Sequence, residues 1–132
     1  MVNEKIVGSN SSKFSWRTRW KSFVHAWEGI VWFLKKEHNA PVHLSATVTV
    51  LVLSVSFGVD KTEAIAVVFS LAFVWVAEMI NTAIEKTIDL VSPAYHPMAK
   101  IVKDVAPGAV LIASLAALFT GCIIFLPKIL SL

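Results

Sequence analysis

The chain has 132 residues, of which 56% are hydrophobic and only 16% are charged, and its mean hydropathy is +0.69. This balance excludes an ordinary soluble domain and indicates one integral membrane domain over residues 1–132. The modest net charge of +3 indicates no nucleic-acid partner, and the single cysteine, Cys122, excludes a disulfide framework within the chain.

The amino-terminal region divides into a polar stretch, residues 1–14, which we expect to be flexible, and an amphipathic helix over residues 15–37. Tryptophan and basic side chains suit the headgroup level of a bilayer, so this helix is predicted to lie on the membrane surface. A second interpretation stays open, in which it also walls a lipid-substrate pocket through Trp27. The apolar residues that recur at helical spacing are Trp16, Trp20, Phe23, Val24, Trp27, Val31 and Leu34.

Two stretches without Asp, Glu, Lys or Arg, residues 41–59 and 105–126, predict spanning helices. Their 19 and 22 residues are long enough to cross about 30 Å of hydrocarbon. A third span is predicted over residues 63–90, which begins apolar and then carries carboxylates. A tight turn precedes it, with Asp60 or Thr62 as its N-cap. The link after it, residues 92–97, contains two prolines and leads into a polar loop.

The distribution of Lys and Arg predicts the orientation of these spans. If the amino terminus is cytoplasmic, ten of the twelve basic residues lie on that side and only Lys61 and Lys128 lie on the other. The positive-inside rule then places the link at residues 92–97 in the cytoplasm. No short apolar core with a cleavage site precedes the first span, so we expect no signal peptide. Three helices alone would leave a polar site facing lipid, so we expect copies to assemble.

Four polar residues of the middle helix, Glu78, Asn81, Thr82 and Glu85, are spaced at i, i+3, i+4 and i+7. This spacing brings them onto one face over about two turns. Charged groups at membrane depth are costly and usually face a bundle interior or a wet cavity, so this face is a candidate functional site. The structural alternative, hydrogen bonding to a neighbouring helix, stays open for Asn81 and Thr82.

The two carboxylates of this face lie about 10 Å apart along the helix, so we expect them to have different roles. Glu85 is closer to the basic link and can meet Glu37, and two carboxylates with phosphate oxygens predict a Mg²⁺ site. Glu78 lies deeper, where it can accept a proton from an alcohol near the acyl boundary. Lys103, with Lys100 nearby, offers a cation for phosphate, although snorkelling at a helix end is the alternative for both lysines.

The middle helix reads E-M-I-N-T-A-I-E-K from Glu78 to Lys86, and with Trp27, Gly29 and Glu37 upstream it resembles the prokaryotic diacylglycerol kinase and undecaprenol kinase family. The E-x-x-N-[ST]-A-I-E signature is specific. The similarity extends from about Phe23 to Leu126. Downstream it includes Asp89, Tyr95-His96-Pro97, Ala99-Lys100, Lys103-Asp104 and Gly108-Ala109-Val110-Leu111.

The resemblance implies an all-α integral membrane fold, with an amphipathic surface helix and three transmembrane helices per subunit of a homotrimer. It implies a multi-pass protein of the bacterial cytoplasmic membrane whose active site faces the cytoplasm. The implied activity is transfer of the γ-phosphoryl group of ATP, the co-substrate, to a lipid alcohol, with Mg²⁺ as cofactor. Neither a P-loop nor a protein-kinase glycine loop occurs in the sequence. ATP must therefore be held in another way.

The resemblance also assigns roles to residues. It implies that Glu78 is the general base and contacts the lipid substrate, and that Asn81 orients the reacting groups. Metal binding falls to Glu37 and Glu85. The implied nucleotide contacts are Glu37, Glu85, Tyr95, His96, Lys103 and Asp104.

The sequence departs from the family pattern in two places. In undecaprenol kinases the segment around the metal-binding glutamate resembles E-R-N-F-R-I-H-L. This chain reads E-H-N-A-P-V-H-L from Glu37 to Leu44. The shared positions favour undecaprenol over diacylglycerol as acceptor. Pro107 is expected in the first turn of the last span, where proline is tolerated. The competing class is a non-catalytic membrane protein, such as a proton-relay or transporter subunit, and the polar segment at residues 95–104 argues against it.

Overall fold

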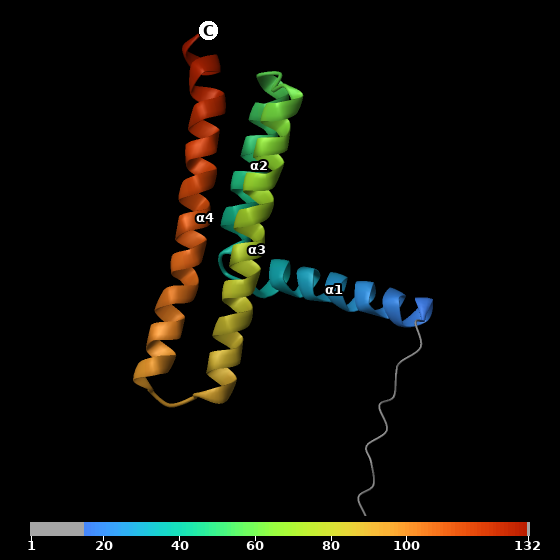
Figure 1. Cartoon of the computed structure of the whole chain (residues 1–132), viewed down its shortest axis with the longest axis vertical. Coiled ribbons are helices and arrows are strands. Elements are labelled where there is room, and N and C mark those ends of the chain that lie inside the picture. The colour runs from blue at the N-terminus through green and yellow to red at the C-terminus, as the bar shows by residue number, and fades with distance from the viewer. Residues whose placement is uncertain (1–14, 132) are drawn as a thin grey trace, which may run out of the picture.

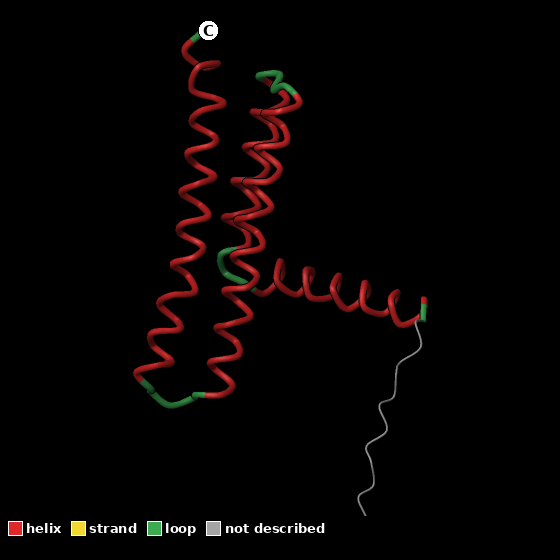
Figure 2. The backbone as a smooth tube through the Cα atoms, viewed as in Figure 1, coloured by secondary structure: helices red, strands yellow, loops and turns green. Residues whose placement is uncertain are grey.

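The computed structural model describes residues 15–131, and this part of the chain is helical apart from short links, as Figure 2 shows. The four helices are α1 (Trp16–Lys36), α2 (Ala40–Ser56), α3 (Lys61–Val91) and α4 (Pro97–Leu130). Helices α3 and α4 run antiparallel side by side, and α2 packs against the first half of α3, whereas α1 projects sideways (Figure 1). The stretch expected to be flexible, residues 1–14, lies outside the described residues.

Among the described residues, two helices are long and apolar enough to cross a membrane. Helix α3 has 31 residues and α4 has 34, so at 1.5 Å per residue each exceeds the roughly 30 Å of a hydrocarbon core. Helix α2 has 17 residues and ends at Ser56, three residues before the predicted end of the first span. It contributes to a third candidate crossing only together with α1, from which it is bent by 100°. The all-helical prediction is confirmed, with two candidate spans or three if the bent pair is one.

The bend between α1 and α2 occurs at a three-residue link. Glu37 has extended backbone and ends α1, and Pro41 in the first turn of α2 provides the fixed φ that favours a helix start. Phe33 and Ala40, on either side of the link, are among the most buried apolar residues of the described chain. The link is therefore packed on both sides and holds a defined geometry.

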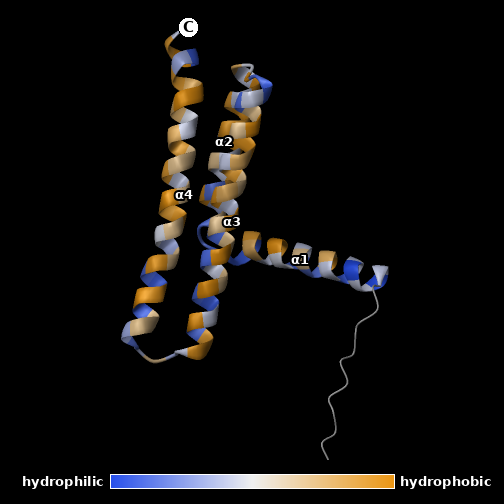
Figure 3. Cartoon of the chain, in the orientation of Figure 1, coloured by the Kyte–Doolittle hydropathy of each residue, from blue (hydrophilic) through white to orange (hydrophobic). Residues whose placement is uncertain are grey.

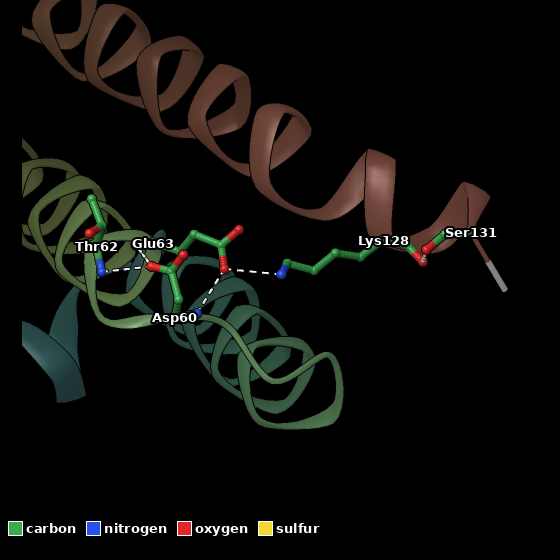
Figure 4. Close-up of polar contacts among 5 residues, drawn as sticks. All are labelled: Asp60, Thr62, Glu63, Lys128 and Ser131. Atoms are coloured by element: carbon green, nitrogen blue, oxygen red, sulfur yellow. Dashed lines mark hydrogen bonds and ion pairs between the residues drawn. The ribbon is translucent and has the colours of Figure 1, made fainter.

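The turn between α2 and α3 depends on a glycine and a capping box. Gly58 has φ of +58°, a left-handed conformation that glycine adopts without strain. The Asp60 carboxylate accepts hydrogen bonds from the backbone of Thr62 and Glu63, at 2.7 and 2.9 Å, so Asp60 is the N-cap of α3. The carboxylate of Glu63 accepts from the Asp60 backbone and forms an ion pair at 3.0 Å with Lys128 of α4 (Figure 4).

The predicted boundary between the polar loop and the last helix was wrong. We expected a polar loop through residue 104, but the helix begins at Pro97, with the His96 side chain accepting from the backbone N–H of Met98. Lys103 therefore lies within the helix. The first turns of α4 can carry polar side chains because those side chains are exposed there. Pro107, expected in a first turn, lies in the interior of α4 instead. Its ring nitrogen cannot donate a hydrogen bond, so the carbonyl of Lys103 one turn earlier loses its helical partner.

Most large apolar side chains of the bundle are exposed in a single chain. Few apolar residues between positions 15 and 131 are buried, and three of them, Val67, Ile124 and Phe125, form a cluster against which residues of α2 pack. Figure 3 shows apolar residues along α2, α4 and the first half of α3, and more hydrophilic ones toward the α3–α4 link. A surface of this kind is stable only against lipid or against other apolar helices.

Candidate active site

Glu78 is a buried carboxylate at the point where α3 meets the start of α2. It is 2% exposed, and the Asn39 amide Nδ2 donates a hydrogen bond of 2.7 Å to its Oε1. His43 Nε2 lies 3.7 Å from the same oxygen. A buried carboxylate needs such polar partners, because removing its charge from water is otherwise very costly. Asn39 is the N-cap of α2 and His43 lies in its first turn, and both approach one oxygen.

The polar face predicted for the middle helix continues from Glu78 toward the α3–α4 link. Glu78, Asn81 and Thr82 are the buried polar residues among those described. The Asn81 amide donates to Glu85 Oε1 at 3.1 Å. Its carbonyl oxygen, Oδ1, is the one buried side-chain polar atom within residues 15–131 that has no hydrogen-bond partner. An unpaired buried acceptor beside a carboxylate is costly unless a cation or donor completes it.

Glu37, the other predicted metal ligand, lies at the α1–α2 link and reaches α3 through Lys86. The Lys86 ammonium is 3.3 Å from a carboxylate oxygen of Glu37, and it also lies 6.0 Å from the centre of the Trp32 ring. Because Lys86 directly follows Glu85, the two predicted ligands approach the same turn of α3. The structure records no contact between them.

The donor atoms of this region fit a hard divalent cation. Glu37 and Glu85 supply carboxylate oxygens, and Asn81 supplies an unpaired carbonyl oxygen, which are the ligand types that Mg²⁺ prefers. Within the described residues no group of three or more His, Cys, Asp or Glu could hold a metal by itself. Mg²⁺ commonly binds to one or two carboxylates and completes its shell with substrate phosphates and water.

Four of the predicted nucleotide contacts, Tyr95, His96, Lys103 and Asp104, lie on and beside the α3–α4 link, and Lys103 and Asp104 are engaged in ion pairs. Lys103 donates to Asp89, and Lys100 donates to Asp104 at 2.8 Å. The hydrogen bond to Asp89 raises the pKa of Lys103, and that to Asp104 raises the pKa of Lys100. Both lysines precede the apolar part of α4. Tyr95 is 80% exposed.

The structure does not bring all predicted site residues together within one chain. No hydrogen bond or ion pair among residues 15–131 joins Tyr95 or His96 to Glu37 or Glu85. Trp27, the predicted lipid contact, is 67% exposed on α1, the helix that leaves the bundle. These residues meet the carboxylates only if another copy of the chain or a bound substrate bridges them.

An apolar cavity of about 440 Å³ lies between α2, α3 and α4. His43 is part of its lining and also lies beside the Glu78 carboxylate, so the ring connects the cavity to the polar face. Trp75, one turn before Glu78, contributes a wall and donates to the Thr47 hydroxyl at 2.9 Å. The other main lining residues are Val50, Val67, Val74, Leu118 and Phe125.

The two residues that contact Glu78, Asn39 and His43, have no role that sequence patterns predicted. Asn39 and His43 are four residues apart at the start of α2, so they share one face, and both fall in the E-x-N-x-x-x-H-L segment that begins at Glu37. That spacing could have identified them as a pair. Their partner could not be identified by spacing, because 39 residues separate Asn39 from Glu78.

Comparison with known proteins gives the same family along most of the chain. The family model described as prokaryotic diacylglycerol kinase matches residues 24–125. The undecaprenol kinase of Bacillus subtilis (strain 168) is 37% identical over 109 residues, which are 83% of this chain and 89% of that protein.

Two further relatives carry the name diacylglycerol kinase. The protein of Synechocystis sp. (strain ATCC 27184 / PCC 6803 / Kazusa) is 35% identical over 112 residues, which are 84% of this chain and 64% of that protein. The protein of Escherichia coli (strain K12) is 32% identical over 79 residues, 60% of this chain and 65% of that protein. The chain therefore spans a little less than two thirds of each of these two relatives.

Proposed function

Because this chain belongs to the prokaryotic diacylglycerol kinase family and is thus a lipid kinase, we propose that it transfers the γ-phosphoryl group of MgATP directly to a lipid alcohol, with undecaprenol as the preferred acceptor. The single observation that carries the mechanism is the environment of Glu78. Its carboxylate is buried and both its neighbours approach Oε1. Oε2 is the oxygen left for a substrate hydroxyl.

Glu78 acts as the general base of the transfer. Its Oε2 takes the proton of the acceptor hydroxyl, the acceptor oxygen bonds to the γ-phosphorus, and the bond to the bridging oxygen of the β-phosphate breaks. ADP leaves with that oxygen. Phosphoryl transfer requires mainly positioning and charge neutralisation, so one base and a few cations suffice. Asn81 orients the neighbouring Glu85 through its amide.

Glu37 and Glu85 would hold Mg²⁺, with the carbonyl oxygen of Asn81 as a further oxygen donor. When bound, Mg²⁺ would supply positive charge that offsets the negative charge developing on the phosphate groups during transfer. Tyr95, His96, Lys103 and Asp104 contact the nucleotide. Lys103 then exchanges its ion pair with Asp89 for one with phosphate, which an exposed pair permits at little cost.

The acceptor lies with its hydroxyl at Glu78 and its hydrocarbon chain toward the apolar cavity. The cavity volume is within the range of ligand pockets, and His43 links the cavity to the carboxylate. Support for undecaprenol comes from the Bacillus subtilis relative, which carries that name and of which the chain covers 89%. The positions shared with undecaprenol kinases at Asn39 and His43, both beside Glu78, agree with this preference.

We place α1 in the cytoplasmic interface of the bacterial inner membrane. It projects sideways from the bundle (Figure 1), and the link that follows it contacts Glu78 through Asn39. From Lys61 to Glu78 helix α3 rises about 26 Å, close to the thickness of the hydrocarbon core. The rest of α3 and the start of α4 then extend into the cytoplasm, where ATP is available. The exposed apolar faces of the helices favour association of three copies, which would also bring a neighbour's residues to each site.

Transfer of radiolabelled γ-phosphate from ATP to purified lipids tests this function. The detergent-solubilised protein should label undecaprenol more efficiently than diacylglycerol, measured as kcat/KM for each lipid, and only when Mg²⁺ is present. Labelling of neither lipid would contradict the kinase assignment for this chain. A higher kcat/KM for diacylglycerol would reverse the acceptor preference and leave the kinase activity intact. The non-catalytic alternative has no support from the named relatives, which are kinases.

A further inference from the structure

We propose that Asn39 is a positioning residue for the general base, holding Oε1 of Glu78 so that Oε2 faces the acceptor hydroxyl. This inference rests on the proposed role of Glu78 and extends it to a residue to which neither the sequence pattern nor the named relatives assign a function. Three features of the start of α2 support it.

The first feature is that Asn39 does not use its side chain where asparagine at its position usually does. Asn39 is the N-cap of α2, and an N-cap asparagine normally accepts a hydrogen bond from the backbone of its own helix. Here the side chain makes no such bond. Its amide is directed across to α3, where it donates to Glu78 at 2.7 Å. The start of α2 therefore lacks a side-chain cap, and the Asn39 amide binds the carboxylate of Glu78 instead.

The second feature is the chemistry of the donor. An amide N–H donates to a carboxylate without carrying a charge and cannot take the proton that the base has to accept. A lysine at this place would form an ion pair and compete with the substrate for the carboxylate. Within residues 15–131, the one basic group in ion-pair range of Glu78 is His43, whose Nε2 at 3.7 Å is beyond hydrogen-bond distance. Asn39 therefore provides the one direct hydrogen bond, and it leaves Oε2 free.

The third feature is the short link that Asn39 shares with Glu37. The two residues are separated by one position, yet Glu37 pairs with Lys86 and Asn39 binds Glu78. Lys86 and Glu78 are eight residues apart on α3, about 12 Å along its axis. The link thus contacts α3 at both ends of the polar face. It sets the position of the base relative to the predicted metal ligand.

Buried packing on each side of the link makes this arrangement rigid. Phe33 and Ala40 are 3% and 1% exposed, and the Phe33 ring packs edge-to-face against Trp75, with centroids 6.0 Å apart. Trp75 in turn lies one turn before Glu78. A catalytic group needs such support, because small displacements of a base reduce the rate more than they reduce substrate binding.

The test compares variants at position 39 that differ in donor and in size. Asn39→Asp keeps the shape but removes the amide donor, Asn39→Ala removes both, and Asn39→Gln keeps a donor on a longer side chain. We expect kcat to fall about 10- to 100-fold in the aspartate and alanine variants, a range typical of a lost orienting partner. The glutamine variant should recover part of that loss. The Kd for MgATP should stay within about twofold in all three, since the amide touches only the base.

Lys128→Met is the matched control, because it removes another polar contact between helices, the ion pair with Glu63 at the far end of the bundle. It should retain wild-type kcat. If Asn39 served only to hold α2 against α3, a folded Asn39→Ala variant would keep kcat near that of the wild type, and this result would overturn the proposal. So would an equal fall in kcat for Asn39→Asp, Asn39→Gln and Lys128→Met.

The outcomes also separate this inference from the proposed function. A wild-type protein that phosphorylates no lipid contradicts the kinase mechanism itself. An active wild-type protein with an equally active Asn39→Asp variant contradicts only the role of Asn39. If Asn39→Ala does not fold, judged by its elution and thermal transition in detergent, the aspartate and glutamine variants decide the question.

Discussion

The ammonium of Lys86 lies 3.3 Å from a carboxylate oxygen of Glu37, so a side chain of α3 neutralises a predicted metal ligand in this structure. The Lys86 side chain is half exposed and that of Glu37 is mostly buried. A pair of this kind contributes little to stability, because water and salt screen the exposed partner. The ammonium can therefore move away when a divalent cation approaches, but it opposes that cation while it remains.

We predict that Lys86→Met lowers the Mg²⁺ concentration needed for half-maximal activity. Removing a competing positive charge beside Glu37 favours the metal, by at most about fivefold for a pair this exposed. A titration of activity with Mg²⁺ at saturating ATP measures the effect, with Lys128→Met as the control on an ion pair at the far end of the bundle. A higher Mg²⁺ requirement in Lys86→Met would show that the ammonium assists the site.

We predict that Glu37→Gln and Glu85→Gln each weaken Mg²⁺-dependent binding of ATP. Each change removes one negative charge from the proposed shell of the metal and leaves the side chain the same size. Equilibrium binding of a fluorescent ATP analogue, measured with and without Mg²⁺, gives the metal-dependent part of the affinity. Glu28→Gln, an exposed glutamate of α1, is the control and should change nothing. Unaltered Mg²⁺ dependence in both site variants would place the metal elsewhere.

The orientation in the membrane can be tested with single cysteines at opposite ends of the bundle. In a Cys122→Ala background, Lys61→Cys should react with a membrane-impermeant reagent from outside the cell, whereas Lys100→Cys should react only after the membrane is opened. The distribution of Lys and Arg requires this arrangement. The reverse pattern of labelling would invert the topology and would place the predicted nucleotide contacts on the side without ATP.

The turn between α2 and α3 gives a prediction about stability. Gly58 has φ of +58°, and a Cβ added there would meet nothing within 4 Å, so strain alone determines the cost of a substitution. Gly58→Ala should destabilise the protein by about 1–2 kcal/mol. Gly29→Ala, in the interior of α1 and equally unobstructed, should be neutral or stabilising. Unfolding in mixed micelles of increasing dodecyl sulfate content compares the two, and equal effects would contradict the strain argument.

The parts of the fold that local patterns determine could be predicted from the sequence. Hydropathy and helical spacing indicated the helices, and Asp60 was one of two N-cap candidates that the turn signals gave. The predicted start of α4 was wrong, because a polar segment after two prolines resembles a loop. The segment is helical because His96 caps it and its charged side chains are exposed on the first turns. Nothing local distinguishes these two outcomes.

Only the part of the candidate site that lies on a single helix could be predicted from the sequence. The burial of Glu78, Asn81 and Thr82 agrees with the face that their spacing defined. The contact of Glu78 with Asn39 depends on how α2 packs against α3, which no local spacing encodes. The hydrogen bond from Lys103 to Asp89 joins α4 to α3, so it also depends on how the helices pack. The roles of Trp27 and Tyr95 remain predictions, since a single chain leaves both exposed.

The role of Glu78 as general base is tested most directly by Glu78→Gln, measured by lipid phosphorylation together with ATP binding in the same detergent-solubilised protein. Glutamine keeps the shape and can still bond to Asn39, but it cannot accept the hydroxyl proton. We expect kcat to fall by about 10²- to 10⁴-fold, with the Kd for MgATP almost unchanged. Turnover near that of the wild type would contradict the account, because glutamine serves as well as glutamate where the residue only joins two helices.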